Sequence, residues 1–264
     1  MLGKLLKYDM KSTARLLIPI YLFVLLTALL TRFVTTVNFF SDHAPVVINF
    51  IIASFVIALI ASFFITIIYL AYYFYRALFT DEGYLAFTLP VTTTEHIFSK
   101  LINFMVWNLI NILTIILSVV IVSFHHEIID FYNQYKEPLF TQFKIYTGTS
   151  VGTFIVLCVI AMFFAMIMSN MMIFAAIAIG HSMGRRKLLN SFLMYIVLNL
   201  ASNMITTVIV TIFGLSNTTE SLVSSNMNDF IHLSFWTNNI TSILLSIVLF
   251  FVTKYFMTKR LNLD

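Results

Sequence analysis

Long runs of apolar residues that contain no charge dominate the pattern along this chain. No acid, base or histidine occurs within residues 45–75, 101–124, 145–180 or 188–215. A membrane-crossing helix needs about 20 mostly apolar residues, and only helices or closed barrels keep the backbone hydrogen-bonded in lipid. The pattern therefore predicts an all-α, polytopic membrane protein.

The apolar segments predict six transmembrane helices in a single domain that covers residues 1–264. The fourth segment would be over roughly 50 Å long at 1.5 Å per residue, so it has to tilt, project beyond the bilayer or break. The predicted spans are 16–40, 46–75, 100–124, 145–180, 188–214 and 238–257.

The residues before the first span have an amphipathic pattern. Their apolar side chains share one helical face and their lysines share another, which predicts an N-terminal interfacial helix at the membrane surface. A basic flank that only fixes the topology is the alternative. The apolar face holds Leu2, Leu5, Leu6 and Met10, and the basic face holds Lys4, Lys7 and Lys11.

Composition and charge predict how the chain is oriented in the membrane. The 264 residues are 60% hydrophobic and 10% charged, whereas a soluble domain carries roughly 25% charge. With six spans and the N-terminus inside, twelve basic residues face the inner side and three the outer side, as the positive-inside rule requires. Both termini are then expected in the cytoplasm. The inner residues are Lys4, Lys7, Lys11, Arg15, Arg76, Lys100, Arg185, Arg186, Lys187, Lys254, Lys259 and Arg260, and the outer ones are Arg32, Lys136 and Lys144.

The connection between the second and third spans, residues 76–100, has recognisable local patterns. Residues 81–83 (Asp-Glu-Gly) predict a turn, and Pro90 interrupts any helix that reaches it. Thr92 and Glu95 have the spacing of a capping box, so a new helix is expected to begin there and to run into the third span.

Apolar and aromatic side chains occur in the same connection, although it is expected to face the cytoplasm. They include Tyr84, Leu85 and Phe87. A partner protein that docks on this loop would cover them. The alternative is that they return to the membrane surface or pack on neighbouring spans.

Polar side chains lie in stripes within two spans. One stripe includes Trp107 and Asn111 with Asn108 nearby, and the other includes Asn199 and Asn203. Such stripes line a substrate path or hydrogen-bond one helix to another. The candidates for a substrate path are Asn108, Asn111, Asn199 and Asn203. Two Gly-x-x-x-Gly patterns, at Gly148 and at Gly180, allow close approach of helices.

A short segment with two histidines, residues 125–130, has some metal-binding residue types. It contains His125, His126, Glu127 and Asp130. A metal site needs more ligands than this pattern guarantees, so we expect no metal and interpret the segment as a helix at the outer membrane interface.

The motifs that are absent limit the mechanism. The sequence has no GxxxxGK[ST] phosphate loop and no HExxH helix. Ion-coupled carriers keep acids or histidines within their spans, and the predicted spans offer none. The chain is therefore not expected to be an enzyme, and energy for any uphill transport is expected from another subunit.

Two stretches carry a resemblance to a known family. The opening MLGKLLKYDMKSTARLLIPIYL and the inner DEGYLAFTLPVTTTEHIFSKLI, together with six spans and a basic end, resemble the membrane subunit of ABC-2 type transporters, a permease family common in Gram-positive bacteria.

The resemblance implies an exporter in a bacterial cell membrane. It implies a second permease copy, as a homodimer or a paired permease, and a separate cytoplasmic ATPase that binds ATP and Mg²⁺, with no cofactor in this chain. The basic clusters are interpreted as membrane anchors, so no nucleic-acid partner is expected. Amphipathic or antimicrobial peptides are the expected substrates. A non-transporting membrane sensor or immunity protein is the alternative. The residues expected to couple to the ATPase are Phe79, Asp81, Glu82, Tyr84 and Phe87.

Overall fold

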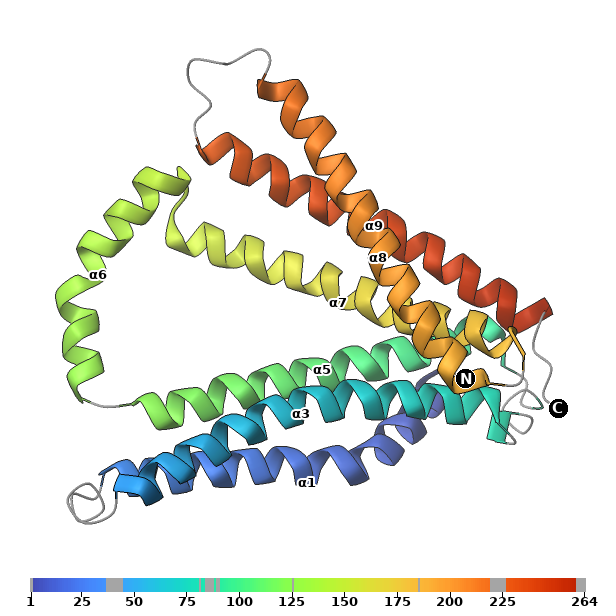
Figure 1. The fold of residues 1–264 in the computed structure, drawn as a ribbon, viewed down its shortest axis with the longest axis horizontal. Coiled ribbons are helices and arrows are strands. Elements are labelled where there is room, and N and C mark those ends of the chain that lie inside the picture. The colour runs from blue at the N-terminus through green and yellow to red at the C-terminus, as the bar shows by residue number, and fades with distance from the viewer. Residues whose placement is uncertain are drawn as a thin grey trace. The chain divides into compact units, whose positions relative to one another are not determined.

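The computed structural model describes residues 2–36, 45–80, 82–83, 88, 91–124, 126–184, 186–218 and 227–259. The long elements within these ranges are all α-helices (Figure 1). Six of them are long and apolar enough to cross a membrane, which confirms the predicted all-α, polytopic architecture. The helices are α1 (Leu2–Thr36), α3 (Pro45–Phe79), α5 (Thr93–Ser123), α6 (His126–Thr147), α7 (Val151–His181), α8 (Lys187–Thr218) and α9 (Met227–Lys259).

The predicted N-terminal interfacial helix is wrong as a separate element. The residues before the first predicted span are the opening turns of α1, which continues to Thr36 without a break. Asp9, Thr13, Leu17 and Tyr21 are buried at a spacing of four, so one packing face runs from the N-terminal turns into the apolar part of the helix. The amphipathic pattern therefore reflects packing within the bundle.

The fourth span is shorter than its charge-free segment. Gly148 has φ = 65°, a conformation that glycine adopts without strain, and the Ser150 hydroxyl accepts a hydrogen bond from the Thr153 backbone as the N-cap of α7. The helix therefore begins at Val151, and the three residues from Ile145 belong to α6. This break removes the need for a span of over roughly 50 Å.

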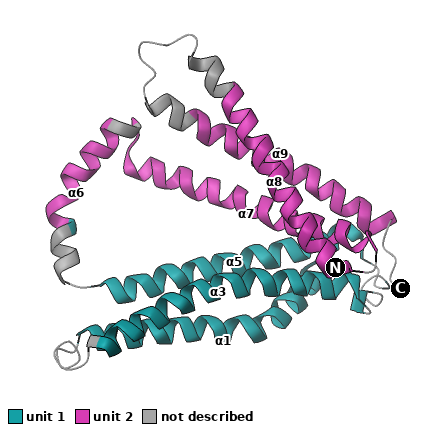
Figure 2. Cartoon of the chain, viewed as in Figure 1, with its two compact units in different colours: residues 1–132 teal, residues 133–264 magenta. Residues whose placement is uncertain are grey.

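The chain forms two compact units, residues 1–132 and 133–264, and each is described by itself (Figure 2). In unit 1, α1 packs against α3 and α5; in unit 2, α7 packs against α8 and α9. The core of unit 1 includes the fully buried Leu17, Phe74 and Phe104. That both units act as one permease domain stays a prediction.

Candidate functional site

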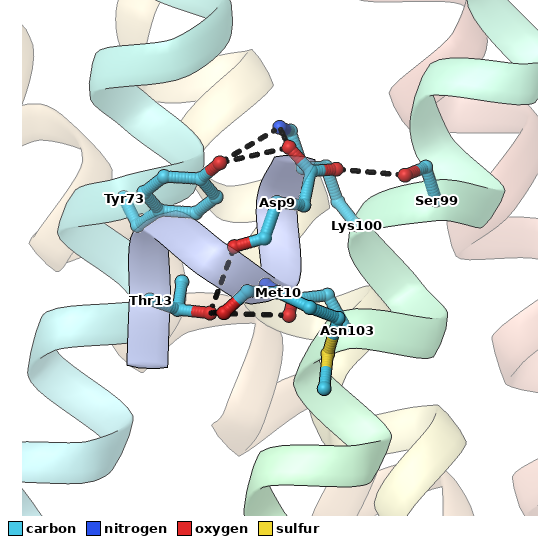
Figure 3. Close-up of polar contacts among 7 residues, drawn as sticks. All are labelled: Asp9, Met10, Thr13, Tyr73, Ser99, Lys100 and Asn103. Atoms are coloured by element: carbon cyan, nitrogen blue, oxygen red, sulfur yellow. Dashed lines mark hydrogen bonds and ion pairs between the residues drawn. The ribbon is translucent and has the colours of Figure 1, made fainter. Parts of the chain in front are cut away.

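A buried ion pair joins α1 to α5 in unit 1 (Figure 3). The Lys100 ammonium group donates to Asp9 Oδ1, and the two side chains are 4% and 5% exposed, respectively. The Ser99 hydroxyl donates to the other carboxylate oxygen, Oδ2, at 2.7 Å. Burying a charge costs several kcal/mol unless it is paired and hydrogen-bonded, so this position holds the two helices together in one register.

Tyr73 brings the third helix of unit 1 into the same cluster. Its hydroxyl donates to Asp9 Oδ1 at 2.8 Å, and Lys100 Nζ lies 4.7 Å from the centroid of its ring, within the range of a cation–π contact. One helical turn further along α1, the Thr13 hydroxyl lies 3.2 Å from Asn103 Oδ1 of α5. We call these residues the Asp9 cluster: Asp9, Thr13, Tyr73, Ser99, Lys100 and Asn103 (Figure 3).

Sequence patterns did not reveal this cluster, because Lys100 counted only as one of the inner basic residues and Asp9 matched no motif. Both side chains are buried in the structure. One pattern could have revealed it: Asp9 is four residues before Thr13, on the buried face of α1, whereas Lys7 and Lys11 are exposed. Since α1 contains a buried acid, ion coupling is compatible with these helices.

A second polar layer lies further along the same three helices. The Asn111 amide donates to Thr66 Oγ1 at 2.9 Å and to the Ser62 carbonyl at 3.2 Å. The Tyr21 hydroxyl lies 3.1 Å from Thr66 Oγ1 and donates to the Trp107 carbonyl at 3.3 Å. Of the two alternatives for Asn111, the geometry shows hydrogen bonding from helix to helix. Asn108, on the next turn, is half-buried.

The other two substrate-path candidates lie in unit 2. Asn203 donates to Asn199 Oδ1 at 2.9 Å along one face of α8, and the Asn199 amide is 3.8 Å from the sulfur of Met172 in α7. Asn203 is exposed within the described chain. Their role in a substrate path stays a prediction.

The connection between α3 and α5 begins and ends as its sequence predicts. The Gly83 amide donates to the Thr80 carbonyl at 2.7 Å, which closes a turn. Before α5, the Thr92 backbone amide donates to the Glu95 carboxylate at 2.9 Å, and the Glu95 amide donates to the Thr92 hydroxyl at 3.3 Å. This reciprocal pair confirms the capping box.

The proposed coupling residues differ in their surroundings. Phe79 is 4% exposed and stacks on Tyr75, with ring centroids 6.4 Å apart, so it belongs to the core of unit 1. Glu82 is exposed and forms an ion pair with Arg76. The remaining coupling candidates, Asp81, Tyr84 and Phe87, lie outside the described residues.

The glycine patterns have three different roles in the structure. A Cβ on Gly180 would lie 2.3 Å from the backbone N and Cα of Ser191, which confirms close approach of α7 and α8 there. Gly148 and Gly184 have positive φ values, 65° and 116°, and serve turns. A Cβ on Gly152 would find its nearest atom 3.9 Å away, so that position packs against no helix.

Metal ligands do not gather in the part of the chain that the structure describes. No group of three or more His, Cys, Asp or Glu side chains there could hold an ion. His125 lies outside the described residues, and the side chains of residues 126–131 are not described.

Comparisons with known proteins add no relative. No protein-family model matches the chain, and neither a curated protein nor a solved structure matches it significantly. Its function therefore has to be argued from its own residues.

Proposed function

We propose that this chain is the membrane-spanning permease subunit of an ATP-driven ABC exporter. Its apolar helices supply the body of a transporter, and its sequence has no phosphate loop with which to hydrolyse ATP. ATP and Mg²⁺ would bind to a separate cytoplasmic ATPase, and a second copy of the permease would complete the assembly.

The observation that carries this proposal is the position of the Asp9 cluster beside the connection between α3 and α5. Tyr73 lies six residues before the end of α3 at Phe79, and Lys100 lies seven residues after the start of α5 at Thr93, which is about 10 Å of helix in each case. Both ends of the connection are thus close to side chains that bind the three helices of unit 1 together.

This arrangement suits a coupling segment. A force on residues 80–92 reaches α3 and α5 at their ends, and the Asp9–Lys100 pair extends it to α1. The three helices would therefore move as one body, whereas a loop between independently mobile helices would bend one of them and transmit little. An ATPase that docks on this loop would then move a whole helix bundle.

Location and substrate follow from the sequence. The twelve-to-three distribution of basic residues supports cytoplasmic termini, and the family resemblance implies a bacterial cell membrane. Exposed methionines, Met162 on α7 and Met204 on α8, and many aromatic side chains supply adaptable apolar surface. We favour amphipathic or antimicrobial peptides as the substrates for this reason.

The test is a pull-down of the full chain from its native membranes, followed by an ATPase assay with Tyr84→Ala and Phe87→Ala. We expect an ATPase to co-purify, and both variants to lose association or to uncouple hydrolysis from substrate. Tyr8→Ala is the matched control, because Tyr8 is 73% exposed and belongs to α1.

The outcomes separate the candidates. Unchanged association and coupling in both loop variants would reject the connection as the coupling segment. A chain that purifies without an ATPase and transports peptide on a proton gradient alone would be an ion-coupled carrier. A chain that shows no transport under either condition would be the sensor or immunity protein.

A further inference from the structure

Helix α6 carries apolar and aromatic side chains in a stripe along one side. Tyr135, Leu139 and Phe143 follow one another at a spacing of four and share one side of the helix. Tyr135 and Leu139 are 41% and 54% exposed, so the chain itself leaves much of this stripe uncovered. Thr141, on the opposite side of the helix, is also exposed but polar.

The connectivity places α6 beside a membrane surface. The helix follows α5 and precedes α7, both of which are long and apolar enough to span (Figure 1). A segment between two consecutive crossings stays on one side of the bilayer. Because α6 is itself not among the candidate spans, it either extends into water or lies along the surface.

One contact shows which surface the stripe adjoins. The ring of Phe143 packs edge-to-face against Phe154, with centroids 5.2 Å apart. Phe154 lies in the first turn of α7, where that helix begins its apolar run, and the next turn exposes Ile155, Val156 and Val159. The stripe of α6 is therefore continuous with the apolar surface of a spanning helix.

The charges of α6 indicate what kind of surface it contacts. Three acids (Glu127, Asp130 and Glu137) and two bases (Lys136 and Lys144) give a formal charge of −1, with histidine neutral. A helix that binds anionic lipid needs a basic polar face, whereas a nearly neutral one binds through its apolar area.

We propose that α6 lies in the membrane interface and binds lipid through the Tyr135–Leu139–Phe143 stripe, at the boundary between headgroups and acyl chains and independently of headgroup charge. Burial of the stripe holds the start of α7 at a fixed depth, because Phe143 and Phe154 are in contact. This inference does not depend on the proposed ATPase partner.

The experiment places an environment-sensitive NBD fluorophore on single cysteines of the full chain. The lone natural cysteine, Cys158, is first replaced by Cys158→Ser. Leu139→Cys probes the stripe, and Thr141→Cys is the matched control on the opposite side of the same helix. Both proteins are placed in phosphatidylcholine nanodiscs, whose two faces are open to solvent.

We expect lipids with a nitroxide on the acyl chain to quench the label at position 139 at least about twofold more than the label at 141, and iodide to show the reverse preference. Replacing part of the phosphatidylcholine with phosphatidylglycerol should leave this ratio unchanged. Equal lipid quenching at the two positions would overturn the proposal. A label at 139 that is shielded from both quenchers would also overturn it, in favour of a protein or a second copy of this chain as the occupant.

Discussion

The two units hold their helices together by different means. In unit 1, side chains from different helices bind one another, through the Asp9–Lys100 pair and through Asn111 with Thr66. In unit 2, α7 approaches α8 closely at Gly180, and the described side-chain contact between these two helices is the weak one from the Asn199 amide to the Met172 sulfur, at 3.8 Å. Both kinds of packing are familiar in membrane bundles.

This difference affects how easily the helices of each unit can move against one another. Polar contacts between helices are directional, and breaking the one at Asp9 leaves a buried charge without its partner. Contacts made by small side chains depend on shape. A small shift of one helix against the other therefore costs less free energy there than separating a buried ion pair. We infer that the three helices of unit 1 resist relative movement more strongly than the helices of unit 2 do.

The largest expected effect comes from breaking the buried pair. Lys100→Met leaves the Asp9 carboxylate buried without a counter-charge, so we expect the free energy of unfolding to fall by about 3–5 kcal/mol. Thermal or denaturant unfolding in detergent, followed by tryptophan fluorescence, measures it. Lys11→Met is the control, because Lys11 is exposed on the same helix.

A double variant tests the cause. Asp9→Asn combined with Lys100→Met removes both charges, so it should be more stable than Lys100→Met alone. If the single variant unfolds like the Lys11→Met control, the pair does not hold α1 to α5 and the contrast between the units fails.

The next effect probes the close approach in unit 2. Gly180→Ala would place a methyl group 2.3 Å from the backbone of Ser191, and we expect a loss of about 1–3 kcal/mol as the helices separate. Gly152→Ala is the control, because its methyl group would meet nothing nearer than the Ser150 hydroxyl at 3.9 Å, and it should cause no loss. Equal unfolding temperatures for the two variants would show that α7 and α8 are not held at this distance.

A smaller effect separates packing from transport at the asparagines. Asn111→Leu removes hydrogen bonds to α3, so stability should fall by about 1 kcal/mol. Asn203→Leu changes an exposed side chain and should leave stability unchanged, with reduced peptide transport if Asn203 lines the path. A stability loss at Asn203 as large as that at Asn111 would assign it to packing.

The smallest effect is expected at the surface of unit 1. The Arg76–Glu82 pair is exposed on both sides, 56% and 52%, so solvent screens it. Arg76→Gln should leave the unfolding temperature unchanged within error. A clear drop would mean that the connection after α3 adds to the stability of unit 1 in addition to the Asp9 cluster.

Sequence reasoning succeeded where the determinant is local. The spans follow from the absence of charge over about 20 residues, and the capping box follows from Thr92 and Glu95, which are three residues apart. The early end of the fourth charge-free segment is also local, since Gly148 and Ser150 are turn and cap residues, but hydropathy alone does not weigh them against a continuous apolar run.

The Asp9 cluster could not be predicted in the same way. Its two charges are 91 residues apart, and without the fold nothing pairs Lys100 with Asp9 in preference to another acid. The position of Asp9 opposite its neighbouring lysines was the available indication. It would have marked Asp9 as buried without identifying its partner.

The long separation of Asp9 and Lys100 also sets an order of assembly for unit 1. At roughly 5–20 residues per second, the ribosome needs about 5–18 s to advance the 91 positions from Asp9 to Lys100. Until Lys100 has been added, the first helix carries an acid on its packing face without this counter-ion, so the three helices of unit 1 cannot reach their final packing before α5 is made.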